Sequence, residues 1–226
     1  MVFNDKWETD IYSQKLQINR YPFDEVVSTV MRLFANTERS KVNVLELGCG
    51  TGNNLAFLAR EGFNVFGVDG SQSAVDTANI FLKTQNLKAN IRCLDFNDLS
   101  TYESNSFDFV LDRGSITHNP RSSIINIITQ VKRILKSNGH FLSIIFSDSH
   151  SGCRFGIKQN DGTYSNFSHG YLKGFDFPFY FASRDDLLEF YDNNFKVINK
   201  IHQVKTDIMS DDDVRAMWFI LAQKYI

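Results

Sequence analysis

A glycine-rich stretch near residue 50 has the spacing of a ligand-binding loop. It reads Gly48-Cys49-Gly50-Thr51-Gly52 and directly follows the apolar run Val42–Leu47. Glycine permits a tight turn and lets a ligand approach the backbone, and the N-terminus of a following helix can bind a carboxylate or a phosphate. The order of strand, glycine loop and helix is the context that a nucleotide-binding loop requires. A tight strand-to-helix turn without a ligand is the alternative.

Acidic residues end three further apolar runs. Asp69 closes the run 64–69, Asp95 with Phe96 follows the run 91–94, and Asp112 closes the run 107–112. In a parallel sheet, ligands bind at the carboxyl ends of the strands, so these side chains are expected at one edge with the glycine loop. A carboxylate there can accept hydrogen bonds from ribose hydroxyls or from an adenine amino group. Each acid taken alone is equally typical of a turn or a helix cap.

The elements that must position these residues alternate along the chain. Strands are predicted at 42–47, 64–69, 91–94, 107–112 and 140–146. Helices are predicted at 53–60, at 71–85 with Ser71 as its N-cap, and at 122–135 with Asn138-Gly139 as its C-cap. Strands separated by helices of this length favour an α/β fold with a doubly wound, mostly parallel sheet.

The alternation stops after residue 147. Residues 148–181 are rich in Gly, Ser, Asn and aromatic residues and show little periodicity, which indicates a lid or an insertion. Ser183 then begins a predicted helix, and strands are predicted at 195–204 and 214–224. The acidic residues 210–213 between these strands are interpreted as a solvated hairpin turn.

With these elements in place, the chain resembles the class I S-adenosylmethionine (SAM)-dependent methyltransferase family. The resemblance rests on Val44–Gly52, Val68–Ser71, Cys93–Phe96, Phe107–Asp112 and Ile134–His140. It implies a Rossmann-like sheet of seven strands, with the last strand antiparallel and inserted between the fifth and sixth. It also implies SAM as the cofactor, held by Glu46, Gly48, Cys49, Gly50, Asn53, Asp69, Gly70, Ser71, Asp95, Phe96, Asp112 and Arg113.

Within that set, the resemblance implies a role for each segment. The glycines line the methionine portion, Asp69 holds the ribose, and Asp95 with Phe96 holds the adenine. The backbone of Asp112 and Arg113 meets the methionine amino group. Glu46 is expected to support the loop indirectly.

A methyl acceptor that loses a proton can be helped by a general base. His118 follows the fourth strand, where the methyl group is expected, and imidazole titrates near neutral pH. Capping the following helix, or packing against it, is the alternative role for His118. Arg113 is a candidate for binding an acidic substrate group or for a structural ion pair. His169, in the lid, is a second candidate base, with a solvent-facing position as the alternative.

The acceptor is expected to be a small molecule, as in O- or N-methylation of a sugar or other metabolite. The residues after Asp112 lack the Asn/Asp-Pro-Pro-Tyr stretch of DNA amino-methyltransferases, and no Pro-Cys pair is present. Aromatic residues crowd two variable segments and can stack on a substrate, although many are expected in the core. They are Trp7, Tyr12, Tyr21, Tyr164, Phe167, Tyr171, Phe175, Phe177, Phe179 and Tyr180.

Composition limits the other function classes. The 226 residues carry a formal net charge of -2, which gives no basic footprint for nucleic acid or an anionic membrane surface. The three cysteines and five histidines show no metal-ligand spacing. We therefore expect a cytoplasmic single domain over 1–226, with an N-terminal cap at 1–40, a lid at 148–182 and no metal.

Three alternatives remain open. One is a methyltransferase that acts on a protein or another macromolecule, and another is a SAM-binding module without catalysis. The third is an NAD-dependent oxidoreductase, whose Gly-x-Gly-x-x-Gly fingerprint is not matched because Asn53 occupies the third glycine position.

Overall fold

The computed structural model describes residues 3–210 and 213–225. The chain divides into two compact units, residues 1–111 and 112–226. A seven-stranded sheet has the order β3-β2-β1-β4-β5-β9-β8, and a separate two-stranded sheet pairs β6 with β7. β2 pairs in parallel with β1 and β3, whereas β9 is antiparallel to both β5 and β8. The predicted α/β class is confirmed. The predicted antiparallel last strand is confirmed as well, because β9 is inserted between β5 and β8.

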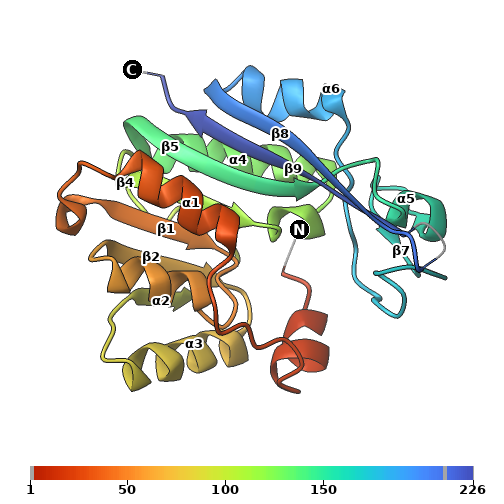
Figure 1. The fold of residues 1–226 in the computed structure, drawn as a ribbon, viewed down its shortest axis with the longest axis horizontal. Helices are drawn as coiled ribbons and strands as arrows, with labels where there is room; N and C mark the ends of the chain where they lie inside the picture. The colour runs from red at the N-terminus through yellow and green to blue at the C-terminus, as the bar shows by residue number, and fades with distance from the viewer. Residues whose placement is uncertain (1–2, 211–212, 226) are drawn as a thin grey trace. The chain divides into compact units, whose positions relative to one another are not determined.

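The first unit alternates strands and helices (Figure 1). Its apolar core comes from the inward faces of these elements, because Val44, Leu45, Leu47, Leu55 and Leu58 are all completely buried. Its elements are η1 (Trp7–Tyr12), α1 (Asp24–Leu33), η2 (Arg39–Lys41), β1 (Asn43–Leu47), α2 (Asn53–Arg60), β2 (Asn64–Asp69), α3 (Gln72–Thr84) and β3 (Asn90–Cys93), followed by β4 (Phe107–Arg113), which ends in the second unit.

Local sequence explains how α3 begins. The Ser71 side chain accepts a hydrogen bond from the Ala74 amide at 3.0 Å, as predicted for an N-cap. Ala74, Ala78 and Leu82 then recur at helical spacing and are buried. The cap fixes the point at which the chain turns from β2 into α3, next to Asp69.

The second unit holds the remaining elements. Ser183 begins α6 with a capping box, in which its side chain and that of Asp186 each bind the other residue's backbone amide. The elements are η3 (Ile116–His118), α4 (Arg121–Ile134), β5 (Leu135–Phe146), α5 (Gly152–Phe155), β6 (Ile157–Lys158), β7 (Tyr164–Ser165), α6 (Arg184–Leu187), η4 (Leu188–Asp192), β8 (Lys196–Asp207) and β9 (Asp213–Gln223).

The predicted C-cap at Asn138-Gly139 is wrong. α4 ends at Ile134, and β5 begins at the next residue. Asn138 does adopt a left-handed conformation, with φ of 63°, but it does so within β5. The Asn138 amide donates to the Lys224 carbonyl at 3.2 Å, and the Lys224 amide donates to the Gly139 carbonyl at 2.9 Å. Pairing with the end of the chain therefore determines the conformation of this stretch.

The segment 148–181 has more regular structure than the sequence predicted. It contains α5, β6 and β7. Its side chains form an aromatic cluster, in which Phe167 lies edge-on to Phe179 and the Phe179 and Phe181 rings stack with centroids 6.3 Å apart. Phe167, Phe177, Phe179 and Tyr180 are buried, which confirms the core alternative for these residues, whereas Tyr171 is 50 % exposed.

The interpretation of residues 210–213 as a solvated turn is wrong for Asp213. This residue begins β9 and is buried, because its carboxylate accepts hydrogen bonds from the Ser151 hydroxyl and from the Tyr171 amide. Asp211 and Asp212 lie outside the described residues. Asp213 therefore anchors the segment 148–181 to the β8–β9 hairpin within the second unit.

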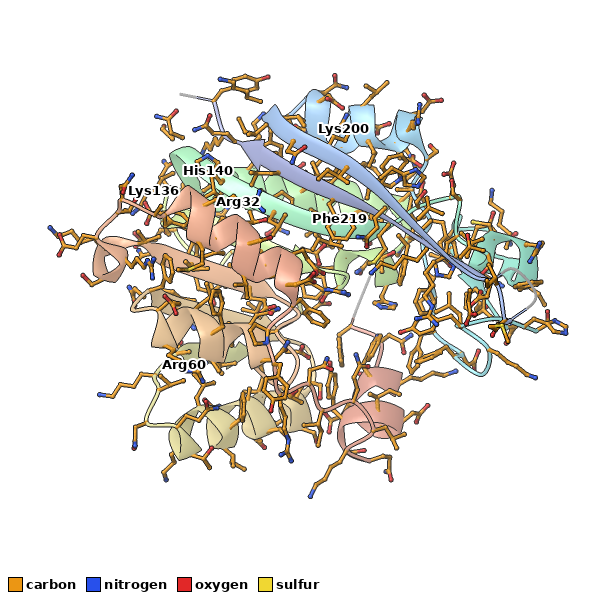
Figure 2. The ribbon with its side chains drawn as sticks, viewed as in Figure 1. Arg32, Arg60, Lys136, His140, Lys200 and Phe219 are labelled. Atoms are coloured by element: carbon orange, nitrogen blue, oxygen red, sulfur yellow. The ribbon has the colours of Figure 1, made fainter. Side chains whose placement is uncertain are left out.

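β8 and β9 form a long hairpin, on which Figure 2 labels Lys200 and Phe219. β8 lies at the edge of the sheet, and the pairing register shifts between Val197 and Asn199. Lys200 forms an ion pair with Asp192, with nitrogen and oxygen 2.6 Å apart. In the described part of the chain, none of the helices has the length and apolar character needed to cross a membrane.

Candidate active site

The glycine loop has the backbone geometry that the sequence predicted. Gly50 and Gly52 both have positive φ, at 50° and 82°, a conformation that strains residues with a Cβ. A Cβ added to Gly52 would lie 3.0 Å from the Cβ of Ala78, so glycine is needed for the close approach of α2 to α3. A Cβ added to Gly50 would lie 2.9 Å from the Tyr12 hydroxyl oxygen. Glycine at position 50 therefore leaves room for the Tyr12 hydroxyl of η1, which lies against the buried backbone of the loop.

The Asp69 carboxylate joins the glycine loop to the end of β2. Its Oδ2 accepts from the Gly50 amide at 2.8 Å, and its Oδ1 accepts from the Ser71 amide at 2.9 Å. Burial raises the pKa of Asp69 to about 6, against the lowering effect of these two hydrogen bonds. A carboxylate offers about four acceptor positions, so Asp69 can still accept from a ligand's hydroxyl groups.

Three other predicted cofactor residues face the protein. Glu46 is buried and accepts from the Asn54 side chain at 2.7 Å, in agreement with an indirect role in supporting the loop. The Asn53 side chain donates to the Tyr21 carbonyl at 2.8 Å. The Cys49 sulfur packs beside Gly67, and burial raises the pKa of its thiol well above the usual value. These three side chains therefore support the loop and its surroundings, and their contact with a cofactor stays a prediction.

Asp95 follows the predicted strand 91–94 and forms an Asx turn. Its Oδ1 accepts from the backbone and side-chain nitrogens of Asn97 at 2.9 and 2.8 Å. Its Oδ2 accepts from the Phe3 amide at 2.8 Å, across 92 residues of sequence. The following residue, Phe96, is buried. The Leu94 amide donates to the Asp69 carbonyl at 2.9 Å, which brings the ends of β2 and β3 together.

The segment before α1 contacts this half of the site at several places, and sequence reasoning identified only its aromatic residues. Glu8 accepts from the Ser71 hydroxyl and from the amide and hydroxyl of Ser73. These hydrogen bonds lower the pKa of Glu8. Phe3 and Glu8 carry no local signal, because their partners lie more than 60 residues away in sequence.

In the second unit, the Asp112 side chain organises the loop after β4. Its Oδ1 accepts from the Ser115 and Ile116 amides at 2.9 and 3.0 Å, and its Oδ2 accepts from the Ser143 hydroxyl at 3.2 Å. The Ser143 hydroxyl also pairs with the Tyr191 hydroxyl at 2.8 Å. Asp112 is completely buried, and burial raises its pKa to about 6. Its carboxylate therefore determines the path of the chain toward His118.

His118 lies on η3 and contacts the lid segment. Its Nδ1 pairs with the Pro178 carbonyl at 3.1 Å, and its ring lies edge-on to Phe179 with centroids 4.5 Å apart. A carbonyl only accepts, so the proton is assigned to Nδ1 and the lone pair to Nε2. Burial lowers the pKa of His118 to about 4. The expected titration near neutral pH is therefore wrong, and His118 is a neutral imidazole and a weaker base at pH 7.

The other two catalytic candidates are not joined to His118 by these contacts. His169 is exposed, and its Nδ1 pairs with the adjacent Ser168 hydroxyl at 3.0 Å. Its ring packs against Phe155. Arg113 is the last residue of β4 and is partly exposed. The catalytic roles of His169 and Arg113 stay predictions.

His150 is a buried histidine that the sequence did not single out. Its Nδ1 accepts from the Gly152 amide at 2.9 Å, and its ring packs between Phe146 and Phe181. Among the described residues its Nε2 has no hydrogen-bond partner. Burial lowers its pKa to about 4. No group of three or more His, Cys, Asp or Glu in the described ranges is arranged to hold a metal ion.

Comparison with known proteins finds similarity to methyltransferases over part of the chain. Residues 44–139 match the family model described as a methyltransferase domain. The chain is 32 % identical over 99 residues to a ubiquinone biosynthesis O-methyltransferase from Rickettsia akari, which covers 43 % of this chain and 39 % of that protein. The chain thus matches about two fifths of that relative's length.

Solved structures share the fold. A SAM-dependent methyltransferase from Methanosarcina mazei superposes with a TM-score of 0.70 at 19 % identity, covering 86 % of this chain and 97 % of that one. The magnesium protoporphyrin IX methyltransferase of Synechocystis PCC 6803, solved with bound SAM, gives 0.67 at 15 % identity, covering 97 % and 94 %. At these identities the likeness is one of fold.

Proposed function

We propose that this chain, whose residues 44–139 match a methyltransferase domain, is a SAM-dependent methyltransferase that transfers a methyl group from SAM to a small molecule. One observation carries the proposal. The Asp69 carboxylate at the end of β2 accepts a hydrogen bond from the Gly50 amide, so an acid that can bind hydroxyl groups and the glycine loop form one unit. We expect this unit to bind the ribose and methionine portions of the cofactor.

The residues present fit that cofactor. Gly50 adds no side chain at the loop, where a Cβ would lie 2.9 Å from the Tyr12 hydroxyl, and Asp69 keeps acceptor positions beyond its two amide donors. Asp95 supplies a carboxylate at the end of the adjacent strand for the adenine amino group. When bound, SAM supplies a methyl group on a sulfonium, which is electrophilic without further activation by the protein.

The work left to this chain is orientation, exclusion of water and removal of a proton. Asp112 holds the loop that carries His118, and the Nδ1 contact with Pro178 orients the ring of His118 toward use of Nε2. We propose that Nε2 accepts the proton that an acceptor hydroxyl or amine loses. Because the pKa of His118 is about 4, it is ready as a base at any pH above about 5.

We propose a small acceptor, as in O- or N-methylation of a sugar or other metabolite. The aromatic cluster beside His118 and the slightly acidic charge of the chain support this class over nucleic acid. We further propose that 1–40 and 148–182 act as cap and lid of one catalytic domain in the cytoplasm. A protein acceptor and a non-catalytic SAM-binding module are the competing proposals.

Calorimetry tests the cofactor, and a metabolite screen tests the reaction. We expect SAM and S-adenosylhomocysteine to bind with one site per chain, and NAD not to bind. Incubation with SAM and a metabolite extract should yield a product heavier by one methylene group. Binding of NAD without SAM would refute the proposal. Binding of SAM without any methylated product from metabolites, peptides or nucleic acids would favour the non-catalytic module.

A further inference from the structure

The chain's N-terminal segment makes contacts that the proposed function does not yet use. Residues 3–12, which we call the clasp, include η1, and Figure 1 shows η1 beside α3. Three residues of the clasp touch three separate parts of the proposed cofactor site. The three parts are the glycine loop, the end of β2 and the end of β3, and all of them lie within the first unit.

Phe3 contacts the adenine side of that site. A Cβ added to Gly70 would lie 2.1 Å from the Phe3 ring, so the ring occupies the space that a side chain at position 70 would fill. The Phe3 amide donates to Asp95 Oδ2 at 2.8 Å. Phe3 thus contacts Gly70, which follows Asp69, through its ring and Asp95, the acid proposed to bind adenine, through its backbone. An aromatic ring in this position offers a face on which a purine can stack.

Tyr12 contacts the opposite end of the site. Its hydroxyl lies over Gly50, and its ring packs near that of Trp7, with centroids 6.1 Å apart. Burial raises the pKa of Tyr12 well above its ordinary value, and the nearby Asp69 carboxylate adds to the increase. Tyr12 is therefore a neutral hydroxyl against the glycine loop.

Glu8 joins the clasp to α3 between these two contacts. Its carboxylate accepts from the Ser71 hydroxyl at 2.5 Å, from the Ser73 hydroxyl at 2.5 Å and from the Ser73 amide at 3.0 Å. Hydrogen bonds to a charged acceptor are about twice as strong as neutral ones. Negative charge at the N-terminus of a helix is also stabilising. Glu8 is therefore the strongest polar attachment of the clasp.

We propose that the clasp closes over bound cofactor, with Phe3 against the purine, and that cofactor enters and leaves only when Glu8 releases Ser71 and Ser73. This proposal rests on the proposed function, because it requires a SAM site at Asp69 and Asp95. Glu8 is a positioning residue in this scheme, since it holds Phe3 and Tyr12 in place. The segment is then part of the site and controls the rate of cofactor exchange.

Substitution of Glu8 tests the proposal on the full chain. Glu8→Gln keeps the size of the side chain but removes the charge that strengthens its hydrogen bonds. We expect S-adenosylhomocysteine to dissociate about 10-fold faster, with a matching loss of affinity. Stopped-flow fluorescence can follow the exchange, because Trp7 lies within the clasp. Asp10→Asn is the matched control, since Asp10 is an exposed acid of the same turn that pairs with the neighbouring Thr9.

A second variant separates the attachment from a general loss of charge. Ser73→Ala removes one hydroxyl donor to Glu8 and leaves the Ser71 cap of α3 intact. We expect Ser73→Ala to speed dissociation on its own and to add little to Glu8→Gln, because both remove the same contact. Thermal unfolding midpoints of the variants establish that each protein is folded before its rates are compared.

The outcomes are distinct. If Glu8→Gln and Asp10→Asn dissociate at the wild-type rate, the clasp does not control exchange, although the SAM site stands. If Glu8→Gln binds S-adenosylhomocysteine more tightly, the segment blocks the site instead of closing over the cofactor, and the proposal is overturned. If the wild-type protein binds neither SAM nor S-adenosylhomocysteine, the proposed function itself fails.

Discussion

Replacement of Asp112 by asparagine is expected to stabilise the ligand-free protein at neutral pH. The carboxylate is completely buried, and its pKa rises from an ordinary 3.8 to about 6. Each pKa unit corresponds to about 1.4 kcal/mol, so keeping Asp112 ionised at pH 7 costs the folded state about 3 kcal/mol. Asparagine retains an oxygen for the Ser115 and Ile116 amides, and its NH₂ group can donate to the Ser143 hydroxyl.

The sign of the pH dependence follows from the raised pKa of Asp112. The preference of the folded state for protonated Asp112 stabilises the protein fully below the unfolded-state pKa of about 3.8. This stabilisation is lost as the pH rises through the folded-state pKa of about 6. Asp112→Asn does not titrate. The variant should therefore exceed the wild type by up to about 3 kcal/mol at pH 7, and the difference should shrink to nothing near pH 3.8.

Urea unfolding at several pH values measures this difference. Circular dichroism and tryptophan fluorescence should give coincident transitions before midpoints are converted to free energies, because the chain has two compact units. Asp185→Asn is the control, since it removes the same charge from an exposed position in the second unit. A loss of stability in Asp112→Asn that is equal at every pH would refute the reasoning. It would mean that the carboxylate's hydrogen bonds outweigh the cost of its buried charge.

Three further outcomes are expected. His118→Ala should lower kcat by about 10²-fold and leave SAM affinity unchanged; the factor is near the lower end for general-base catalysis because the pKa of about 4 makes His118 a weak base. In the wild type, kcat/KM should show no fall due to His118 between pH 8 and pH 5. Full activity of the variant would reject His118 as the general base. Asp69→Ala should weaken SAM binding by about 1–3 kcal/mol in calorimetry, and unchanged affinity would remove it from the ribose role. Cofactor should slow proteolysis within 148–181, whereas equal cleavage with and without cofactor would indicate a passive insertion.

The sequence predicted the parts of the fold that depend on local patterns. Apolar runs gave β1, β2 and β4 to within a residue or two, and the caps at Ser71 and Ser183 were read correctly because capping uses residues three apart. The glycine loop was also predictable, since positive φ favours a residue without a Cβ. These local features carry the resemblance to methyltransferases that the sequence shows.

Features set by distant contacts were not predictable. The Asn138 region was predicted to end a helix, but pairing with Lys224 draws it into β5. Glu8 resembles any exposed acid until α3 is brought beside it. His118 looked like a group that titrates near pH 7, and only its burial beside Phe179 shows that its pKa is far lower. Chemistry that depends on environment therefore needed the folded chain.

The edge position of β8 has a consequence for solubility. A strand of 12 residues at the end of a sheet presents unpaired backbone groups that can recruit a strand from another molecule. Lys196, Lys200 and Lys205 place positive charge along this edge, and the irregular register near Val197 interrupts its flatness. Both features oppose edge-to-edge aggregation. They act along a hairpin that carries partly exposed apolar side chains such as Ile201.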